Sequence, residues 1–392
     1  MKINYNPKYP LVEDLRNRAR RRIPQFAFDY VDGGCNEEVN LQRNTAEIQE
    51  IELVPRYISK ITESNLKTKL FGHTYDAPFG IAPMGLQGMI WPDSSAILAK
   101  AAHAHNIPFV LSTVTTSSIE EVSEITDGRA WFQLYHPVED TLRDKLLHRA
   151  EAAGCSVLVI ISDVPTFGYR AKEIRSGLAM PPRMTLRNIC QMVTKPNWAL
   201  RSLYHGRPQF ATLQPYIPKN LDLRNLGRFM NETFKGTLNE TKIARLRDKW
   251  KRKLIIKGLT SEEDMEIAIK LGLDGVIVSN HGGRQLDAAE STIKSVQRIA
   301  PKYGDRIEVM MDSGIRSGPD VARTIACGAR FAFLGRPFMY GVAALGKEGG
   351  NHTVSIIKTQ LRQVMEQIRC GSTSELPLFL NKNQTKESSR SQ

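Results

Sequence analysis

Short apolar segments and longer amphipathic segments alternate along the chain from residue 79 onward. Each apolar segment has the length of a strand, is rich in β-branched or aromatic residues, and is bounded by Gly, Pro or polar residues. The pattern predicts eight strands, at residues 79–83, 108–111, 130–134, 157–161, 254–257, 275–278, 308–311 and 331–334. The intervening segments predict helices, for example at 94–105, 138–153, 261–271 and 319–327.

Strands that alternate with helices form parallel sheets, because each helix carries the chain back to the start of the next strand. Eight is also the number of strands that closes a (β/α)8 barrel, the TIM barrel. The sequence therefore predicts an α/β fold of this kind. A doubly wound open sheet is the alternative.

Three segments lie outside the repeat. Residues 1–78 contain a helical stretch and an extended, Pro-containing passage, and we interpret them as an N-terminal helical extension. Residues 165–240 form a long insertion between the fourth and fifth strands, and the polar residues 381–392 are predicted to be a disordered tail. We predict one domain over residues 1–380, in which the barrel spans 79–375.

The composition excludes several classes of protein. The chain has 392 residues, 41% of them hydrophobic and 24% charged, which excludes a disulfide-stapled miniprotein and a disordered chain. No apolar run approaches the roughly 20 residues of a membrane-spanning helix, and the first residues lack the apolar stretch of a secretory signal. The five cysteines are scattered and form no C-x-x-C pair, as expected of reduced thiols in the cytosol.

The positive charge is concentrated in one part of the sequence. The formal net charge is +13, and residues 183–253 contain 16 Lys and Arg against 4 Asp and Glu, a local net charge of +12. Amphipathic pieces lie within this stretch at 184–193 and 198–204. These features predict docking on an anionic membrane surface, and hence a cytoplasmic protein that is peripheral on the inner membrane. A solvated basic flap over the active site is the alternative.

Neither a nucleic-acid partner nor a metal is predicted. No DNA- or RNA-binding motif accompanies the basic residues, and aromatic residues among them are sparse. His103 and His105 are two residues apart on a predicted helix and therefore face different sides.

Polar and charged residues follow nearly every predicted strand. Barrel enzymes place their chemistry at the carboxyl ends of the strands, so these residues form the candidate active site. After the seventh and eighth strands, Gly314, Gly335 and Arg336 offer backbone N–H groups and a guanidinium where such barrels usually hold a phosphate.

The segment Ser279–Asp287, SNHGGRQLD, resembles the active-site signature of the FMN-dependent 2-hydroxy acid dehydrogenases and oxidases. This family includes glycolate oxidase, L-lactate dehydrogenase of the cytochrome or quinone type, and (S)-mandelate dehydrogenase. Residues 132–135, 256–258, 312–316 and 334–337 support the match in the order found in the family. The resemblance covers residues 10–375.

The resemblance implies the roles of the catalytic and substrate-binding residues. His281 would take a proton from the substrate, and Asp163 would stabilise the imidazolium that forms. The substrate-binding residues would be Tyr30, Tyr135, Arg170 and Arg284. The two arginines would bind the substrate carboxylate, because a planar guanidinium binds a carboxylate through two hydrogen bonds.

The resemblance also implies FMN as the cofactor. Lys257 would lie beside the pyrimidine edge of the flavin and stabilise its anionic reduced form. The residues lining the isoalloxazine would be Pro83, Met84, Gly85, Ser112, Gln133 and Ser279. The ribityl and phosphate groups would contact Asp312, Gly314, Arg316, Gly335 and Arg336.

The chain departs from the family at one flavin contact. Many members have Thr two residues before the catalytic aspartate, whereas this chain has Ile161 there. A methyl group cannot donate a hydrogen bond, and Ser162 is expected to face the opposite side of the strand.

The resemblance is closest to the respiratory members of the family. We predict the oxidation of L-lactate to pyruvate, with a quinone or cytochrome as electron acceptor and a homo-oligomeric enzyme. (S)-Mandelate dehydrogenase and an oxygen-using 2-hydroxy acid oxidase are the alternatives within the family. Outside it, the alternatives are a different phosphate-binding barrel and a non-catalytic binder of anionic surfaces.

Overall fold

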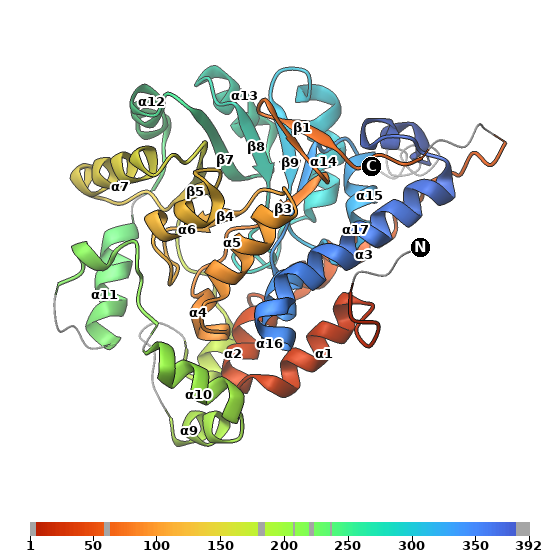
Figure 1. Ribbon diagram of the computed structural model, residues 1–392. Helices are drawn as coiled ribbons and strands as arrows, with labels where there is room; N and C mark the ends of the chain where they lie inside the picture. Colours follow the sequence, from red (N-terminus) through yellow and green to blue (C-terminus); the bar gives the residue numbers. More distant parts are fainter. Residues whose placement is uncertain are drawn as a thin grey trace.

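The computed structural model describes residues 5–58, 63–178, 185–206, 208–218, 223–235 and 237–381 (Figure 1). Its main sheet has eight parallel strands, in the order β3-β10-β9-β8-β7-β6-β5-β4. The strands are β3 (Phe79–Ile81), β4 (Val110–Ser112), β5 (Trp131–Leu134), β6 (Val157–Ile161), β7 (Lys253–Leu259), β8 (Gly275–Val278), β9 (Glu308–Met311) and β10 (Phe331–Leu334).

The sheet closes into a barrel. A parallel bridge pairs Ile81 with Phe109, and the Ile81 N–H donates to the Pro108 carbonyl at 2.9 Å, which joins the first strand to the second. The predicted (β/α)8 barrel is therefore confirmed, and the open doubly wound sheet is excluded. Each strand lies within about two residues of its predicted position.

The strands are buried on both faces, which explains why they are nearly continuous apolar runs in the sequence. Along β6, Val157 and Val159 point into the barrel, whereas Leu158 and Ile160 pack against the surrounding helices. All four side chains are at most 2% exposed.

A hairpin closes the amino end of the barrel. It consists of β1 (Thr68–Leu70) and β2 (His73–Tyr75), and Leu70 and Tyr75 belong to the same apolar cluster as the barrel interior. The ring of Phe71, at the turn, lies 5.8 Å from the ring of Trp131. The sequence analysis predicted only an extended passage here, because each strand is three residues long and too short to show a period.

The helices pack around the barrel. The four predicted barrel helices are present as α5 (Ser94–Ala104), α7 (Asp140–Ala152), α13 (Glu262–Lys270) and α15 (Gly318–Ala326). Other helices around the barrel are α4 (Gln87–Ile90), α6 (Ile119–Thr126), α14 (Thr292–Tyr303), α16 (Arg336–Leu345) and α17 (Gly349–Ile368). Hydroxyl caps begin three of them: Ser118 accepts from the Glu121 N–H, Ser261 from the Asp264 N–H, and Ser317 from the Asp320 N–H.

The N-terminal extension contains α1 (Val12–Arg22), α2 (Gln25–Asp32) and α3 (Val39–Gln49). In Figure 1, α1 lies against α16, and the Arg18 and Arg22 guanidinium groups donate to the Ala344 carbonyl. Beyond α3, Leu53 bridges to Leu380 near the end of the described chain. The predicted disordered tail, apart from Asn381, lies outside the described residues.

The insertion contains α8 (Ala171–Ser176), α9 (Leu186–Val193), α10 (Pro196–His205) and α11 (Leu223–Phe234), and α12 (Glu240–Lys249) begins where it ends. The helices predicted at 184–193 and 198–204 correspond to α9 and α10, although Met184 lies outside the described residues. The indole of Trp198 fixes α10 to the N-terminal part of the chain, because it donates to the Ile90 carbonyl at 3.0 Å and packs on Phe26.

The described helices of the stretch 183–253 do not all lie on one side of the molecule. In Figure 1, α9 and α10 lie at the bottom of the molecule, whereas α12 lies at the top. Several cations near α12 are paired with acidic residues, for example Lys249 with Asp144 at 2.6 Å and Arg245 with Asp140 at 3.3 Å. Docking of this stretch on an anionic membrane therefore stays a prediction, and one flat surface would contact only part of its cations, because a charge summed along the sequence does not show where the fold places it.

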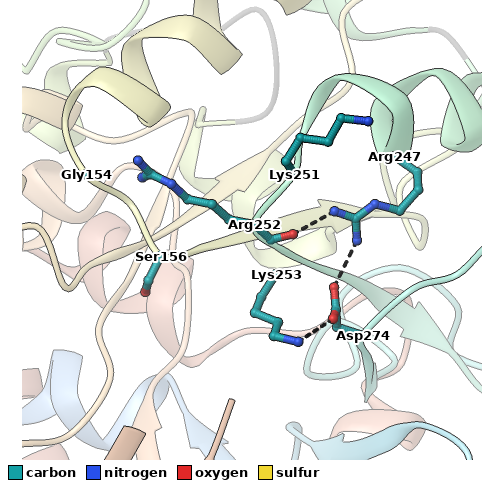
Figure 2. Close-up of a pocket in the computed structure, with 7 residues that line it drawn as sticks. All are labelled: Gly154, Ser156, Arg247, Lys251, Arg252, Lys253 and Asp274. Atoms are coloured by element: carbon teal, nitrogen blue, oxygen red, sulfur yellow. Dashed lines mark hydrogen bonds and ion pairs between the residues drawn. The ribbon is translucent and has the colours of Figure 1, made fainter. Parts of the chain in front are cut away.

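A cavity of about 550 Å³ lies at the amino ends of β6 and β7, away from the strand ends where chemistry is predicted. Its lining residues are Gly154, Ser156, Arg247, Lys251, Arg252, Lys253 and Asp274 (Figure 2). Asp274 accepts hydrogen bonds from both Arg247 and Lys253, so part of the positive charge of the residues lining the cavity is already neutralised.

Candidate active site

The carboxyl ends of four neighbouring strands bring the predicted catalytic residues together. Asp163 follows β6, Lys257 lies near the end of β7, His281 follows β8, and Asp312 follows β9. Their side chains are buried or nearly so: 9% exposed for Asp163, 4% for Lys257 and 20% for His281. The strand order of the barrel thus assembles a polar cluster at its carboxyl end, where these side chains are largely shielded from solvent.

His281 and Asp163 form the central pair of this cluster. The His281 Nδ1 lies 3.0 Å from Asp163 Oδ1. Since an ionised carboxylate only accepts hydrogen bonds, Nδ1 carries the proton and Nε2 is left with its lone pair. Burial lowers the pKa of His281, and the opposing effect of Asp163 does not fully compensate, so the ring is neutral at neutral pH.

Lys257 is the buried cation of the cluster. Its Nζ donates to the Ser279 hydroxyl at 2.8 Å and lies 3.1 Å from Asp312 Oδ2 and 3.6 Å from Asp163 Oδ2. Burial lowers the pKa of Lys257, but the two carboxylates outweigh it and raise the value to about 12. Burial likewise opposes ionisation of Asp163, but Lys257 and then His281 lower its pKa to about 2. Both groups are therefore charged throughout the physiological pH range.

The segment Ser279–Asp287 is held by helix α3. Asn280 and Asn44 exchange side-chain hydrogen bonds at 2.7 and 2.9 Å, and the Asp287 carboxylate accepts from the Asn40 N–H at 2.9 Å. Gly283 has φ +71°, and a Cβ there would lie 2.6 Å from the backbone of α3, so no larger residue fits. The sequence analysis missed Asn40 and Asn44, whose only signal is a pair of asparagines four residues apart on an amphipathic helix.

Arg170 and Arg284 meet at a third residue, Glu173. The Arg284 guanidinium donates to Glu173 Oε1 at 2.6 Å, and Arg170 lies 3.5 Å from Glu173 Oε2. Arg284 also donates to the backbone carbonyl of Tyr30 at 2.6 Å and lies over its ring, 4.8 Å from the centroid. The structure therefore brings the predicted carboxylate-binding arginines together with Tyr30, around a glutamate that the sequence analysis did not identify.

The remaining side chains of the predicted substrate and flavin faces lie at or just beyond the carboxyl ends of β3, β4 and β5, and on α2. The Tyr30 hydroxyl donates to the Gly85 carbonyl at 3.3 Å, which links the N-terminal extension to the segment Pro83, Met84, Gly85. Ser112 and Gln133 are 1% and 2% exposed. Burial, with a contribution from Asp163, raises the pKa of Tyr135 to about 12, so its hydroxyl stays protonated.

The residues after β9 and β10 fit a phosphate. Arg336 is 9% exposed, and burial followed by the nearby Arg316 lowers its pKa to about 9. None of the ion pairs among the described residues includes the guanidinium group of Arg316 or Arg336. An anion from outside the chain would therefore supply the ion-pair partner that both lack there. Gly314, at φ +81°, lets the loop pass against the Asn44 backbone, and Gly335 precedes the first residue of α16.

The structure shows the consequence of Ile161. Its backbone pairs with Lys257 in the β6–β7 register, at the flavin end of the strand. The Ser162 hydroxyl donates to the Lys257 carbonyl at 2.9 Å, so it is not directed to where the threonine hydroxyl of other members would be. The loss of one polar contact to the flavin at this position therefore stays a prediction, and Ser162 does not compensate for it.

Comparison with known proteins decides the family. The sequence profile of the FMN-dependent dehydrogenases matches residues 19–382, which include every site residue described above. The chain belongs to the FMN-dependent dehydrogenase family. The resemblance of Ser279–Asp287 to the FMN-dependent 2-hydroxy acid enzymes is thereby confirmed, as are the oxidoreductase class and FMN as the cofactor.

Individual relatives agree with this family. The chain is 37% identical over 353 residues to an L-lactate dehydrogenase of Caulobacter sp. (strain K31), covering 90% of this chain and 93% of the relative. The crystal structure of the monotopic membrane protein (S)-mandelate dehydrogenase matches with a TM-score of 0.90 and 32% identity, over 95% of this chain and 99% of that one. A mandelate oxidase structure matches with a TM-score of 0.82 and 28% identity, over 95% and 98%.

Replacing Lys257 with Met should destabilise this FMN-dependent dehydrogenase strongly. The substitution leaves the carboxylates of Asp163 and Asp312 buried without their cation, which costs about 3–5 kcal/mol in the free energy of unfolding. Lys270→Met is the matched control, since Lys270 is 73% exposed and pairs with Glu240 at the surface. We expect the control to change stability by less than about 1 kcal/mol in denaturant titrations. Equal effects of the two substitutions would contradict the importance of the buried cluster.

Proposed function

We propose that this enzyme oxidises an L-2-hydroxy acid to the 2-keto acid, with L-lactate as the substrate and pyruvate as the product. The observation that carries the proposal is the His281–Asp163 pair in the same buried mouth as Arg170 and Arg284. A base beside a pair of guanidinium groups suits a substrate that carries a hydroxyl next to a carboxylate. The L-lactate dehydrogenase relative supports the choice of L-lactate.

His281 acts as the base in this proposal. Its Nε2 takes the proton of the 2-hydroxyl, and the imidazolium that forms is stabilised by the Asp163 carboxylate at 3.0 Å. Bound FMN would supply the acceptor for the hydrogen of the substrate carbon and its two electrons, the oxidant needed to convert the C–O bond to a carbonyl. The hydroxyl proton therefore goes to His281, whereas the two electrons leave with the hydrogen of the substrate carbon. The imidazolium must release its proton to solvent before the next turnover.

Substrate binding falls to the arginines and tyrosines. Arg170 and Arg284 bind the carboxylate through charge-assisted hydrogen bonds. Tyr30 and Tyr135 donate their hydroxyls, which burial keeps protonated. The ring of Tyr135 packs edge-on against Phe234 of α11, 6.0 Å between centroids, so the insertion contributes to the wall of this side of the site.

FMN binding falls to three groups of residues. Pro83, Met84, Gly85, Ser112, Gln133 and Ser279 lie at the strand ends that face the ring. Lys257, charged and buried, stabilises negative charge on the reduced ring. Asp312, Gly314, Arg316, Gly335 and Arg336 would hold the ribityl chain and the phosphate. The strongest support for this assignment is that Arg316 and Arg336 donate to backbone carbonyls but have no ion-pair partner among the described residues.

(S)-Mandelate is the second candidate substrate. The close match to (S)-mandelate dehydrogenase over nearly the whole of both chains supports it. The two candidates differ in side-chain size and share the hydroxyl and carboxylate, so the catalytic residues are the same for both.

The purified enzyme should be yellow, and L-lactate should bleach its flavin under anaerobic conditions faster than (S)-mandelate does. His281→Ala should keep FMN but lower the rate of flavin reduction by about 10³-fold, since the proton acceptor is lost. Stopped-flow absorbance at the flavin band measures both rates. If His281→Ala reduced its flavin at the wild-type rate, His281 would not be the base. If (S)-mandelate bleached the flavin faster than L-lactate, (S)-mandelate would be the preferred substrate.

The value of kcat/KM should fall as the pH is lowered through the pKa of His281, which lies below the ordinary histidine value of about 6.5. Burial lowers the pKa of His281, so its basic form persists at pH values where a surface histidine is already protonated. Activity is therefore present above this pKa and lost as the pH falls through it. Asp163→Asn removes the group that raises the pKa of His281, so the acid limb should move to still lower pH. An acid limb above pH 7 would contradict this assignment.

We further propose that the hairpin of α9 and α10 docks the enzyme on a membrane. The apolar face of α9 points outward: Leu186 is 81% exposed and Val193 is 73% exposed, whereas the polar Asn188 is buried. On α10, Leu203 and Tyr204 are 78% and 87% exposed. Soluble helices normally bury such residues, so two adjacent helices with outward apolar faces fit the interfacial region of a bilayer.

The cations of the hairpin support an anionic surface. Arg187 on α9 and Arg201 on α10 are exposed beside the apolar residues. None of the helices in the described part of the chain is both long and apolar enough to span a bilayer. We propose a peripheral position on the cytoplasmic side of the inner membrane, with electrons passing to a quinone or a membrane cytochrome, and the exposed apolar and basic residues of the hairpin support the membrane contact. The membrane-associated (S)-mandelate dehydrogenase of Pseudomonas putida, matched through a soluble mutant at a TM-score of 0.81 and 32% identity, over 95% of this chain and 99% of that one, supports it.

The wild-type enzyme should sediment with anionic liposomes, and the double variant Leu186→Glu/Leu203→Glu should not. Each burial of a leucine contributes on the order of 1.5 kcal/mol, and a glutamate adds repulsion from anionic lipid. Because part of the affinity is apolar, about 1 M salt, with a screening length of about 3 Å, should weaken the binding without abolishing it. Leu378→Glu, at a 58% exposed leucine of η3 (Thr373–Phe379), is the matched control and should still sediment. Identical sedimentation of all three proteins would rule out docking through the hairpin.

A further inference from the structure

Glu173 lies between Arg170 and Arg284, the two arginines that are proposed to bind the substrate carboxylate. It lies on the short helix α8 and is 7% exposed. Its Oε1 accepts from Arg284 at 2.6 Å, and its Oε2 lies 3.5 Å from Arg170. A carboxylate of the protein itself is therefore already paired with both guanidinium groups.

The other contacts of these arginines are with neutral groups. Arg284 donates to the backbone carbonyls of Tyr30 and Gly33 at 2.6 and 3.0 Å. Arg170 donates to the Gln285 side-chain oxygen at 3.0 Å. Among the ion pairs of the described residues, those of both arginines are with Glu173. Two cations and one anion leave the cluster with a net charge of +1.

The neutral contacts also fix the direction of Arg284. The Nη1 atom of Arg284 donates to both carbonyls, whereas its Nη2 atom donates to Glu173. The guanidinium plane is thus set by the N-terminal extension on one edge and by α8 on the other. A substrate carboxylate would meet a guanidinium that has already lost most of its rotational freedom.

We propose that Glu173 is a positioning residue that sets the charge of the arginine cluster at +1 and so selects substrates with a single carboxylate. This inference rests on the proposed function, in which Arg170 and Arg284 bind that carboxylate. One monoanion then neutralises the arginine cluster, whereas a dianion leaves an excess negative charge in a buried, poorly screened environment. Glu173 acts through the arginines and takes no part in the proton transfer.

Charge and shape can be separated at this position. Glu173→Gln keeps the shape of the side chain and removes its charge, so the site becomes +2. Glu173→Asp keeps the charge. Should Glu173→Gln fail to retain FMN, the pair Glu173→Asp and Glu173→Asn offers the same comparison at a shorter side-chain length.

Oxalate and oxamate are suitable probes, since they have nearly the same shape, and at neutral pH oxalate carries two negative charges and oxamate one. Their dissociation constants for the FMN-loaded enzyme can be measured from the perturbation of the flavin absorbance and from competition with L-lactate. In Glu173→Gln the affinity ratio of oxalate to oxamate should rise about tenfold, because one unit of repulsion at short range is removed. In Glu173→Asp the ratio should stay near that of the wild type.

Glu38→Gln is the matched control. Glu38 pairs with Lys172, the neighbour of Glu173 on α8, at 2.8 Å, but lies outside the arginine cluster. The control removes one negative charge next to the same helix and should leave the ratio unchanged. A general loss of structure would weaken both probes together and would not change their ratio.

The inference is overturned if both probes bind to Glu173→Gln with the wild-type ratio, which would leave the proposed function intact. If neither probe perturbs the flavin or competes with L-lactate in the wild-type enzyme, the assignment of the arginines to the carboxylate is wrong, and the role of Glu173 is overturned with it.

Discussion

The buried ammonium group of Lys257 is the interaction on which the active site depends. A cation without water is costly unless anions surround it, and the barrel meets this requirement by placing Asp163 and Asp312 at 3.6 and 3.1 Å. The three residues come from three different strands, β6, β7 and β9. The same Asp163 holds His281, so the orientation of the base and the neutralisation of the lysine are parts of one network. A change in one member therefore alters the charge and the position of the others.

Much of the barrel could be predicted from the sequence, because strands buried on both faces leave short apolar runs that are easy to recognise. The site could be predicted in part for a related reason: a residue that follows a strand in a parallel barrel lies at the catalytic end. The sequence did not indicate Glu173, Asn40 or Asn44. Each is a polar residue on a helix, and only the tertiary contact with a distant loop distinguishes it from a solvated surface residue. The hairpin at residues 68–75 was missed because its strands are too short to show a pattern.

Charge proved harder to interpret than hydrophobicity. The excess of Lys and Arg in residues 183–253 predicted docking on an anionic membrane, but the described helices of this stretch lie on opposite sides of the molecule. The more informative feature is the outward apolar face of α9, which a sequence pattern cannot distinguish from a face directed to the core. In the neighbouring helix α10, Trp198 contacts Phe26 of α2, the helix that also carries Tyr30. The proposed membrane contact and the substrate site are thus connected through one short helix.

The bridge between Leu53 and Leu380 has a consequence for the order of folding. The segment that carries Tyr30 and Asn44 is synthesised first, yet it packs against α16 and against residues close to position 380, which are synthesised last. Contacts between residues more than 300 positions apart form slowly, because a long loop must close before they contribute stability. The early helices must therefore remain without their packing surface during most of translation. A chain of this topology acquires its complete catalytic pocket only after the last barrel strand and helix α17 have left the ribosome, which makes the nascent chain a substrate for chaperones at that stage.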